Sequence, residues 1–217
     1  MVRLQGPLSD ADLDHFVAKG YVLVKEGVPK ETAVAWGNEA YQRLGYDPED
    51  NTTWEKDRLH MPAHKHVPVA EIAPKAWAAM VQLAGGEDRI RQPALWGDAF
   101  IANFGERSTE PWKPAGPDCP GWHKDGDFFL HFLDSPEQGL LVIPLWTDVV
   151  HQGGPTYIAP DSIRVLAEFL RDRPEGVMPG EFGFQNLIRQ CHEFGEAVGE
   201  EGDVYLLHPF MLHAVSQ

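Results

Sequence analysis

The sequence predicts a β-sheet core of the sandwich or barrel type, with helices packed outside it. Short apolar runs separated by turn residues recur from about residue 95 onward, whereas the preceding part has helical spacing. The chain of 217 residues contains 18 Pro and 21 Gly, which suits a core with many turns. Seven Trp and eleven Phe provide aromatic surface that can line a cavity. This length fits one domain better than two.

The N-terminal part, residues 1–92, is expected to be mainly helical and to pack on the core. Ser9 and Asp12 have the spacing of a capping box, and the apolar residues after them predict a helix that ends at Gly20. The stretch 60–66 is typical of a loop, because it is rich in His and Pro. The other elements expected here are a strand at 21–24, a helix from Pro29 to Gly45 and a helix over 73–83.

Residues 93–217 are expected to form the β core, interrupted by one helix over 161–172. Its strands are predicted from apolar runs bounded by turn residues, and they lie at 99–104, 128–132, 140–146, 156–159, 186–191 and 204–207. A further strand should follow and carry His213. Several short antiparallel strands of this kind are typical of a sandwich or barrel.

Charge and composition exclude several classes of protein. Lys and Arg number 18 and Asp and Glu number 33, so the net charge is −15, which disfavours a nucleic-acid partner. No stretch approaches the roughly 20 apolar residues of a membrane span, and the N-terminus lacks the apolar core of a signal peptide. Two cysteines, Cys119 and Cys191, are too few for a disulfide framework, which favours the cytoplasm. We expect a small-molecule substrate and no membrane partner, and the oligomeric state stays open.

A candidate metal site is visible in the segment that contains His123 and Asp125. Residues i and i+2 of an extended chain point to the same side, so these two side chains can converge on one point. An imidazole and a carboxylate are two of the three ligands of a 2-His-1-carboxylate iron site. Either His208 or His213 can supply the third. The spacing alone leaves a second interpretation open, in which these histidines are structural.

Three blocks in order resemble the phytanoyl-CoA dioxygenase family of iron(II)- and 2-oxoglutarate-dependent oxygenases. The blocks are Trp122-His-Lys-Asp125, Gly153-Gly-Pro-Thr-Tyr-Ile-Ala-Pro-Asp-Ser162 and Gly202-Asp-Val-Tyr-Leu-Leu-His-Pro-Phe-Met-Leu-His213. The resemblance implies a double-stranded β-helix (jelly-roll, cupin-like) core with flanking N-terminal α-helices. It further implies that Fe(II) is held by His123, Asp125 and His213, that 2-oxoglutarate is the cosubstrate and that O2 is consumed. His208 is then a structural neighbour of the site.

The resemblance also assigns the cosubstrate contacts. Asn103 and Thr156 are the candidates for binding 2-oxoglutarate. The family places an Arg about ten residues after the distal His, where its guanidinium binds the distal carboxylate of the cosubstrate. The sequence ends at Gln217, so we expect that the jelly roll lacks its final strand. Otherwise a basic residue elsewhere must bind this carboxylate, and the candidates are Arg107, Arg164 and Arg189.

The expected function is oxidation of an unactivated C–H bond in a small, hydrophobic molecule, with release of succinate and CO2. Asp125 favours hydroxylation, or a rearrangement such as desaturation, over halogenation, because the related halogenases lack this carboxylate. A cupin-like metal enzyme that does not use 2-oxoglutarate is one alternative. A non-catalytic jelly-roll module that binds a ligand is the other. His64 and His66 are expected to be solvated or to face the substrate, and His131 to pack in the core.

Overall fold

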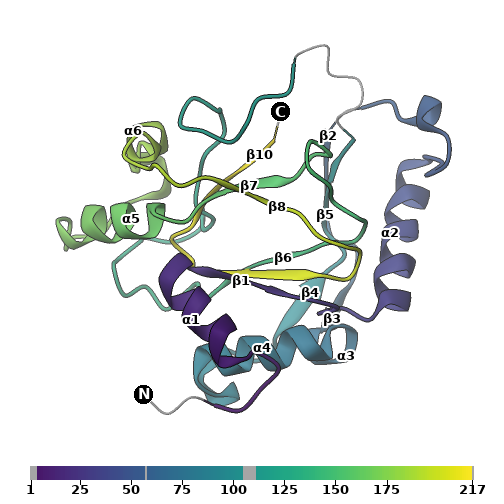
Figure 1. Ribbon diagram of the computed structural model, residues 1–217. Coiled ribbons are helices and arrows are strands. Elements are labelled where there is room, and N and C mark those ends of the chain that lie inside the picture. The colour runs from purple at the N-terminus through teal and green to yellow at the C-terminus, as the bar shows by residue number, and fades with distance from the viewer. Residues whose placement is uncertain (1–3, 57, 105–110, 217) are drawn as a thin grey trace.

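The computed structural model describes residues 4–56, 58–104 and 111–216, with antiparallel strands at the centre and helices around them (Figure 1). The helices are α1 (Asp10–Lys19), α2 (Lys30–Leu44), α3 (Val69–Ile72), α4 (Pro74–Ala84), α5 (Ser162–Arg171) and α6 (Phe184–Ile188). The strands are β1 (Tyr21–Val24), β2 (Arg58–Met61), β3 (His66–Pro68), β4 (Leu95–Gly97), β5 (Phe100–Asn103), β6 (Leu141–Pro144), β7 (Thr156–Ala159), β8 (Gly195–Ala197), β9 (Val204–Leu207) and β10 (Leu212–Val215). Short 3-10 turns lie at Asn51–Thr53, Glu87–Arg89 and Pro179–Glu181.

Two three-stranded antiparallel sheets form the core. One has the order β1-β9-β6 and the other β10-β7-β8, and two-stranded ladders pair β2 with β5 and β3 with β4. The N-terminal strand β1 is therefore part of the core, with Tyr21 opposite Leu207. The predicted fold class, mainly β with N-terminal helices, is confirmed.

The start and the end of α1 show how local sequence signals act. The Asp12 N–H donates to Ser9 Oγ at 3.2 Å, and the Ser9 N–H donates to Asp12 Oδ2 at 2.8 Å, so the predicted capping box is present. The helix ends at Gly20, whose φ of +73° is a left-handed conformation that favours glycine. A Cβ atom at Gly20 would also meet the end of the Ile163 side chain, which would have to shift.

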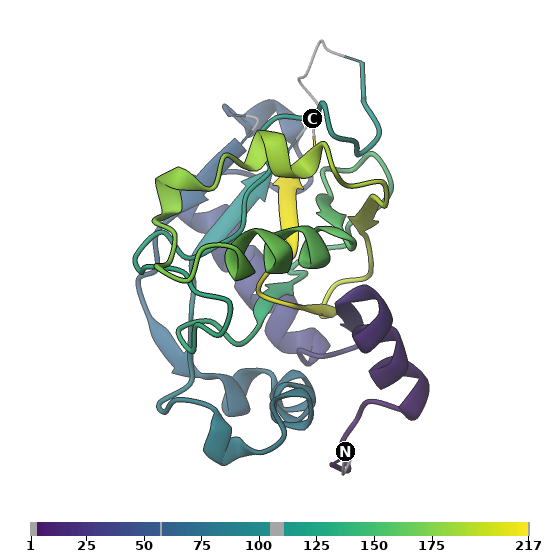
Figure 2. The same ribbon diagram turned by 90° about the vertical axis from the view of Figure 1, so that its left-hand side faces the viewer.

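Helices cover the outer faces of both sheets. Figure 2 shows α5 and α6 in front of β10, where Leu166 and Ile188 are fully buried beside Tyr157 and Leu212. α4 packs on the other sheet through residues such as Ala76, in a cluster that includes apolar side chains of β1 and β9. No helix in the described part of the chain is both long enough and apolar enough to span a bilayer.

The structure corrects three local predictions. Residues 128–132 form turns instead of a strand, and only His131 makes an isolated bridge, to Val177. The segment predicted as a strand at 186–191 lies in and after the short helix α6. Its buried residues are Leu187, Ile188 and Cys191, and this spacing suits a helical turn better than an alternating strand. The stretch 60–66 is not all loop, because it includes the end of β2 and the start of β3.

A buried carboxylate holds β2, β3, β4 and β5 together. Asp98, which lies between β4 and β5, is completely buried. Its Oδ1 accepts the backbone N–H groups of His64 at 2.6 Å and Lys65 at 2.8 Å, both in the β2–β3 connection. Its Oδ2 lies 3.2 Å from Arg43 Nη1 of α2. Burial by itself would raise the pKa of Asp98, but these N–H groups and the charge of Arg43 hold it below its ordinary value.

Candidate metal centre

Two histidines from distant parts of the chain are brought side by side by a single β-bridge. The His123 N–H donates to the His213 carbonyl at 3.0 Å, and the His213 N–H donates to the His123 carbonyl at 2.9 Å. His213 belongs to β10, whose register against β7 places it opposite Ile158. The imidazole centroids lie 4.3 Å apart, so both rings occupy the same side of the bridge.

Asp125 completes the group. Its Oδ1 lies 3.5 Å from His123 Nε2 and 3.4 Å from His213 Nε2. One ligand atom of each residue lies within 4.8 Å of the others, and the described residues contain no other such group of three His, Cys, Asp or Glu. The His213 side chain is 10% exposed, whereas those of His123 and Asp125 are 45% and 44% exposed, so the group is open on one side.

The backbone orients both imidazoles for metal binding. His123 Nδ1 lies 2.8 Å from the Gly121 carbonyl, and His213 Nδ1 lies 3.2 Å from the Met211 carbonyl. A carbonyl only accepts, so each Nδ1 donates a proton to its carbonyl, and each Nε2 faces Asp125, where it can donate to the carboxylate or, when deprotonated, bind a metal. Once both Nε2 atoms are deprotonated, three electron-pair donors face one another. A divalent cation stabilises such a set, and two imidazoles with one carboxylate suit iron(II).

The neighbouring histidines keep the Asp125 carboxylate ionised, which is the form that can bind a metal. Hydrogen bonds from His123 and His213 hold the pKa of Asp125 far below its ordinary value, despite partial burial. The same contact with Asp125 raises the pKa of His123, although burial and the positive charge of Arg58 act in the opposite direction. Asp125 is therefore ionised at neutral pH, and a proton competes with a metal ion for His123.

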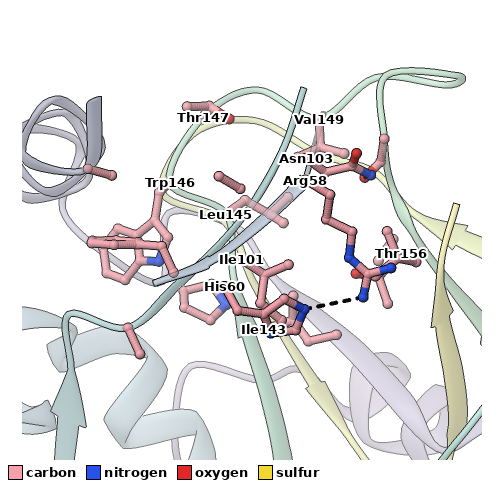
Figure 3. A pocket seen from close by; sticks show the side chains of 18 of the residues that line it. Arg58, His60, Ile101, Asn103, Ile143, Leu145, Trp146, Thr147, Val149 and Thr156 are labelled. Carbon is pink, nitrogen blue, oxygen red and sulfur yellow. Dashed lines mark hydrogen bonds between the residues drawn. The ribbon is translucent and has the colours of Figure 1, made fainter. Parts of the chain in front are cut away.

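The three residues line a pocket of about 430 Å³. Its walls are formed by residues 99–104, which include β5, and by residues 141–149, which include β6. Apolar side chains such as Ile101, Ile143 and Trp146 project toward this space (Figure 3). The pocket therefore combines a polar metal-binding group with a largely apolar wall, as expected of a site for a small organic molecule.

Both predicted cosubstrate residues line this pocket. The Asn103 side-chain N–H donates to the Gly154 carbonyl at 3.3 Å, which joins β5 to the turn before β7. A Cβ atom at Gly154 would lie 2.9 Å from Asn103 Nδ2, so this close approach requires glycine. Thr156 begins β7 and lies opposite Val215 of β10. Asn103, Thr156 and the metal-binding group thus share one cavity.

The structure places the basic residues differently from the prediction. Arg107 lies outside the described residues. Arg164 is on the surface of α5, where it lies 3.6 Å from Glu168, and neither it nor Arg189 lines the pocket. Among the described lining residues the only Lys or Arg is Arg58 of β2, which the sequence reasoning missed. The available signal was the alternation of Arg58 and His60, but no strand was predicted there.

The other histidines noted in the sequence do not join the metal-binding group. His208 Nδ1 accepts the Phe210 N–H at 3.1 Å, so it supports the turn before β10. His66 is the first residue of β3 and His64 precedes that strand, and neither lines the pocket. His131 is buried, as predicted.

Lys124 lies between the candidate ligands His123 and Asp125 in sequence, but its side chain is buried in the protein. Its Nζ donates to the Asp125 carbonyl at 2.9 Å, to His131 Nδ1 at 3.0 Å and to Gln138 Oε1 at 3.3 Å. His131 Nε2 in turn donates to the Gly126 carbonyl at 2.6 Å. Burial lowers the pKa of Lys124 to about 8. This cluster fixes the backbone of the loop that carries Asp125.

Comparison with solved structures places the fold. EctD from S. alaskensis, solved with 2-oxoglutarate and 5-hydroxyectoine, matches 97% of this chain and 71% of its own, with 16% identity and a TM-score of 0.51. The apo form of the same protein gives a TM-score of 0.52 at 17% identity. A hypothetical protein from Escherichia coli also gives 0.52, at 12% identity, and this chain spans 64% of its length. These likenesses confirm the jelly-roll class of the core.

Sequence comparison adds no closer assignment. No protein-family model matches the sequence, and a search of curated proteins found no relative. The chain therefore shares its fold with EctD at low sequence identity.

Proposed function

We propose that this chain is an iron(II)- and 2-oxoglutarate-dependent dioxygenase related to the phytanoyl-CoA dioxygenase family. It hydroxylates or otherwise oxidises an unactivated C–H bond of a small, hydrophobic molecule and releases succinate and CO2. The observation that carries the proposal is the convergence of His123, Asp125 and His213 in one pocket. The fold likeness to EctD, which was solved with 2-oxoglutarate, supports it.

In this proposal His123, Asp125 and His213 hold the metal on one face and leave the other face free for small ligands. Bound iron(II) supplies the redox chemistry, with O2 as the oxidant and 2-oxoglutarate as the co-reductant that loses CO2. The backbone carbonyls of Gly121 and Met211 accept from the Nδ1 atoms, which leaves the Nε2 atoms as the nitrogens that would bind the metal. The ionised Asp125 offsets the charge of the cation.

The cosubstrate and the substrate are proposed to share the pocket. Asn103 and Thr156 offer hydrogen-bonding side chains to 2-oxoglutarate from neighbouring positions on the wall. The apolar side chains of Ile101, Ile143 and Trp146 favour a hydrophobic substrate and limit the access of water. Both cysteines are free, which is consistent with the cytoplasm as the proposed location.

The experiment is an anaerobic iron(II) titration with 2-oxoglutarate, followed in air by a screen for succinate release. Replacing His123, Asp125 or His213 by alanine should abolish iron binding and turnover while circular dichroism shows an intact fold. His208→Ala is the matched control and should leave iron binding nearly unchanged, because His208 lies outside the group. Loss of iron binding in His208→Ala but not in His213→Ala would contradict the assignment. A protein that binds iron but never 2-oxoglutarate would be the alternative metal enzyme.

A further inference from the structure

The β2–β5 ladder presents a polar face to the pocket. Arg58 and His60 are two residues apart on β2, so their side chains point to the same side. Their partners on β5 are Asn103 and Ile101, and all four residues line the pocket. In Figure 3 the Arg58 guanidinium lies between the His60 ring and Thr156. A cation therefore lies beside both candidate cosubstrate residues.

Arg58 has no ion-pair partner among the residues that the structure describes. Its Nη2 lies 3.3 Å from His60 Nε2, and because guanidinium only donates, His60 accepts with an uncharged nitrogen. No described carboxylate lies within ion-pair distance of Arg58. His60 thus orients the guanidinium without neutralising it. An oriented, unneutralised guanidinium in a pocket is suited to bind a carboxylate.

We infer that Arg58 is the carboxylate-binding residue of this pocket and holds the distal carboxylate of the 2-oxo acid. This inference rests on the proposed function, because the other end of the acid is then bound at the metal. The cation comes from β2, on the N-terminal side of the metal ligands in the chain. Neither Arg164 nor Arg189 can replace it, because neither lines the pocket.

The net charge of the protein makes this single cation more important. At −15 the surrounding field repels a dianion such as 2-oxoglutarate. Asp125 adds a negative charge within the pocket unless a metal ion offsets it. A local charged donor such as Arg58 offsets this repulsion and favours binding of the distal end.

The test compares two 2-oxo acids that differ only at the distal end. 2-Oxopentanoate has the chain length of 2-oxoglutarate but carries a methyl group in place of the distal carboxylate. Each acid is titrated anaerobically into the iron-loaded protein, and binding is read from the visible charge-transfer absorption of the metal chelate instead of from turnover. The wild-type protein should bind 2-oxoglutarate about 10- to 100-fold more tightly, as expected for a charge-assisted pair.

Arg58→Met should remove this preference by weakening the binding of 2-oxoglutarate far more than the binding of iron or 2-oxopentanoate. Arg58→Lys should restore part of the preference, because it keeps the charge but not the two-pronged geometry. Arg164→Met is the matched control, since Arg164 is 74% exposed and lies outside the pocket, and it should change nothing.

Two negative results can be told apart. If Arg58→Met keeps the wild-type preference for 2-oxoglutarate, the assignment of Arg58 is wrong, although the proposed function stands. The same holds if Arg58→Met weakens both acids equally, because the residue then acts on the site as a whole. If the iron-loaded wild-type protein binds neither acid, the proposed function is wrong and the inference falls with it.

Discussion

Replacing Asp98 by alanine should destabilise the protein strongly, although the residue lies outside the metal-binding group. The change removes a completely buried carboxylate that accepts two backbone N–H groups and faces Arg43. The N–H groups of His64 and Lys65 would lose their acceptor, and Arg43 would keep only the carbonyls of Asp98 and Pro62.

The magnitude follows from these contacts. A hydrogen bond to a charged group contributes about 1.5–3 kcal/mol, and removing one partner of a buried ion pair costs about 3–5 kcal/mol. These contributions overlap, so we expect Asp98→Ala to lower the free energy of unfolding by about 3–5 kcal/mol. Asp98→Asn keeps an oxygen acceptor and should cost about 1–2 kcal/mol.

The pKa of Asp98 is lowered in the fold, so its charge stabilises the folded protein at pH values above the ordinary pKa of 3.8. That contribution is lost as the pH falls through the pKa of Asp98 in the folded protein. The difference in the free energy of unfolding between wild type and Asp98→Asn should therefore become smaller in acid.

Urea unfolding at neutral pH, followed by Trp fluorescence, measures these differences. Asp172→Ala is the matched control, because Asp172 contacts Arg171 on the exposed surface and should leave the midpoint unchanged. If Asp98→Ala lowers the free energy of unfolding by less than about 1 kcal/mol, the reasoning is refuted. Water would then satisfy the N–H groups and the guanidinium that lose the carboxylate. A parallel loss of 2-oxoglutarate affinity is expected, because Asp98 anchors the connection that follows β2.

Two further predictions concern the pocket. Cobalt(II) affinity should rise between pH 6 and pH 8, because a proton competes for His123. The stability of the metal-free protein should instead fall as the pH rises. The raised pKa of His123 contributes stability that is complete below pH 6.5 and is lost as the pH rises through the pKa of the folded state. His123→Gln should flatten the stability profile in scanning fluorimetry and weaken cobalt binding at every pH in calorimetry, and an unchanged stability profile would exclude His123 as its cause. Asn103→Ala and Thr156→Val should each raise the 2-oxoglutarate concentration needed for half-maximal binding more than they alter iron affinity. Equal effects on both ligands would remove these residues from the cosubstrate site.

Local sequence signals predicted those elements whose cause is local. The capping box at Ser9 and the left-handed end at Gly20 require only neighbouring residues, and both are present. The strands β7 and β9 are apolar runs bounded by turn residues, and each has at least three buried positions. The i, i+2 argument for His123 and Asp125 also holds, although only one β-bridge keeps that segment extended.

The failures have physical causes too. A five-residue helix such as α6 is too short to show its period, so its apolar run resembles a strand. β2 has two exposed polar residues and is stabilised by pairing with β5, far along the chain. The role proposed for Arg58 therefore depends on a contact that no local pattern contains. The prediction of a strand at 128–132 was wrong. Phe128 and Phe132 are exposed, so burial of their side chains does not stabilise a strand there.

The cluster around Lys124 has a consequence for the iron dependence that we propose. Lys124 and His131 fix the loop that carries Asp125 through contacts to Gln138 and two backbone carbonyls, none of which is a metal-ligating atom. In small zinc domains metal binding supplies the folding free energy, so the metal-free chain is unfolded. Here the ligand geometry is held by the protein itself. Under the proposed function, iron scarcity would therefore leave a folded, inactive reserve, and restored supply would recover activity without new synthesis of the chain.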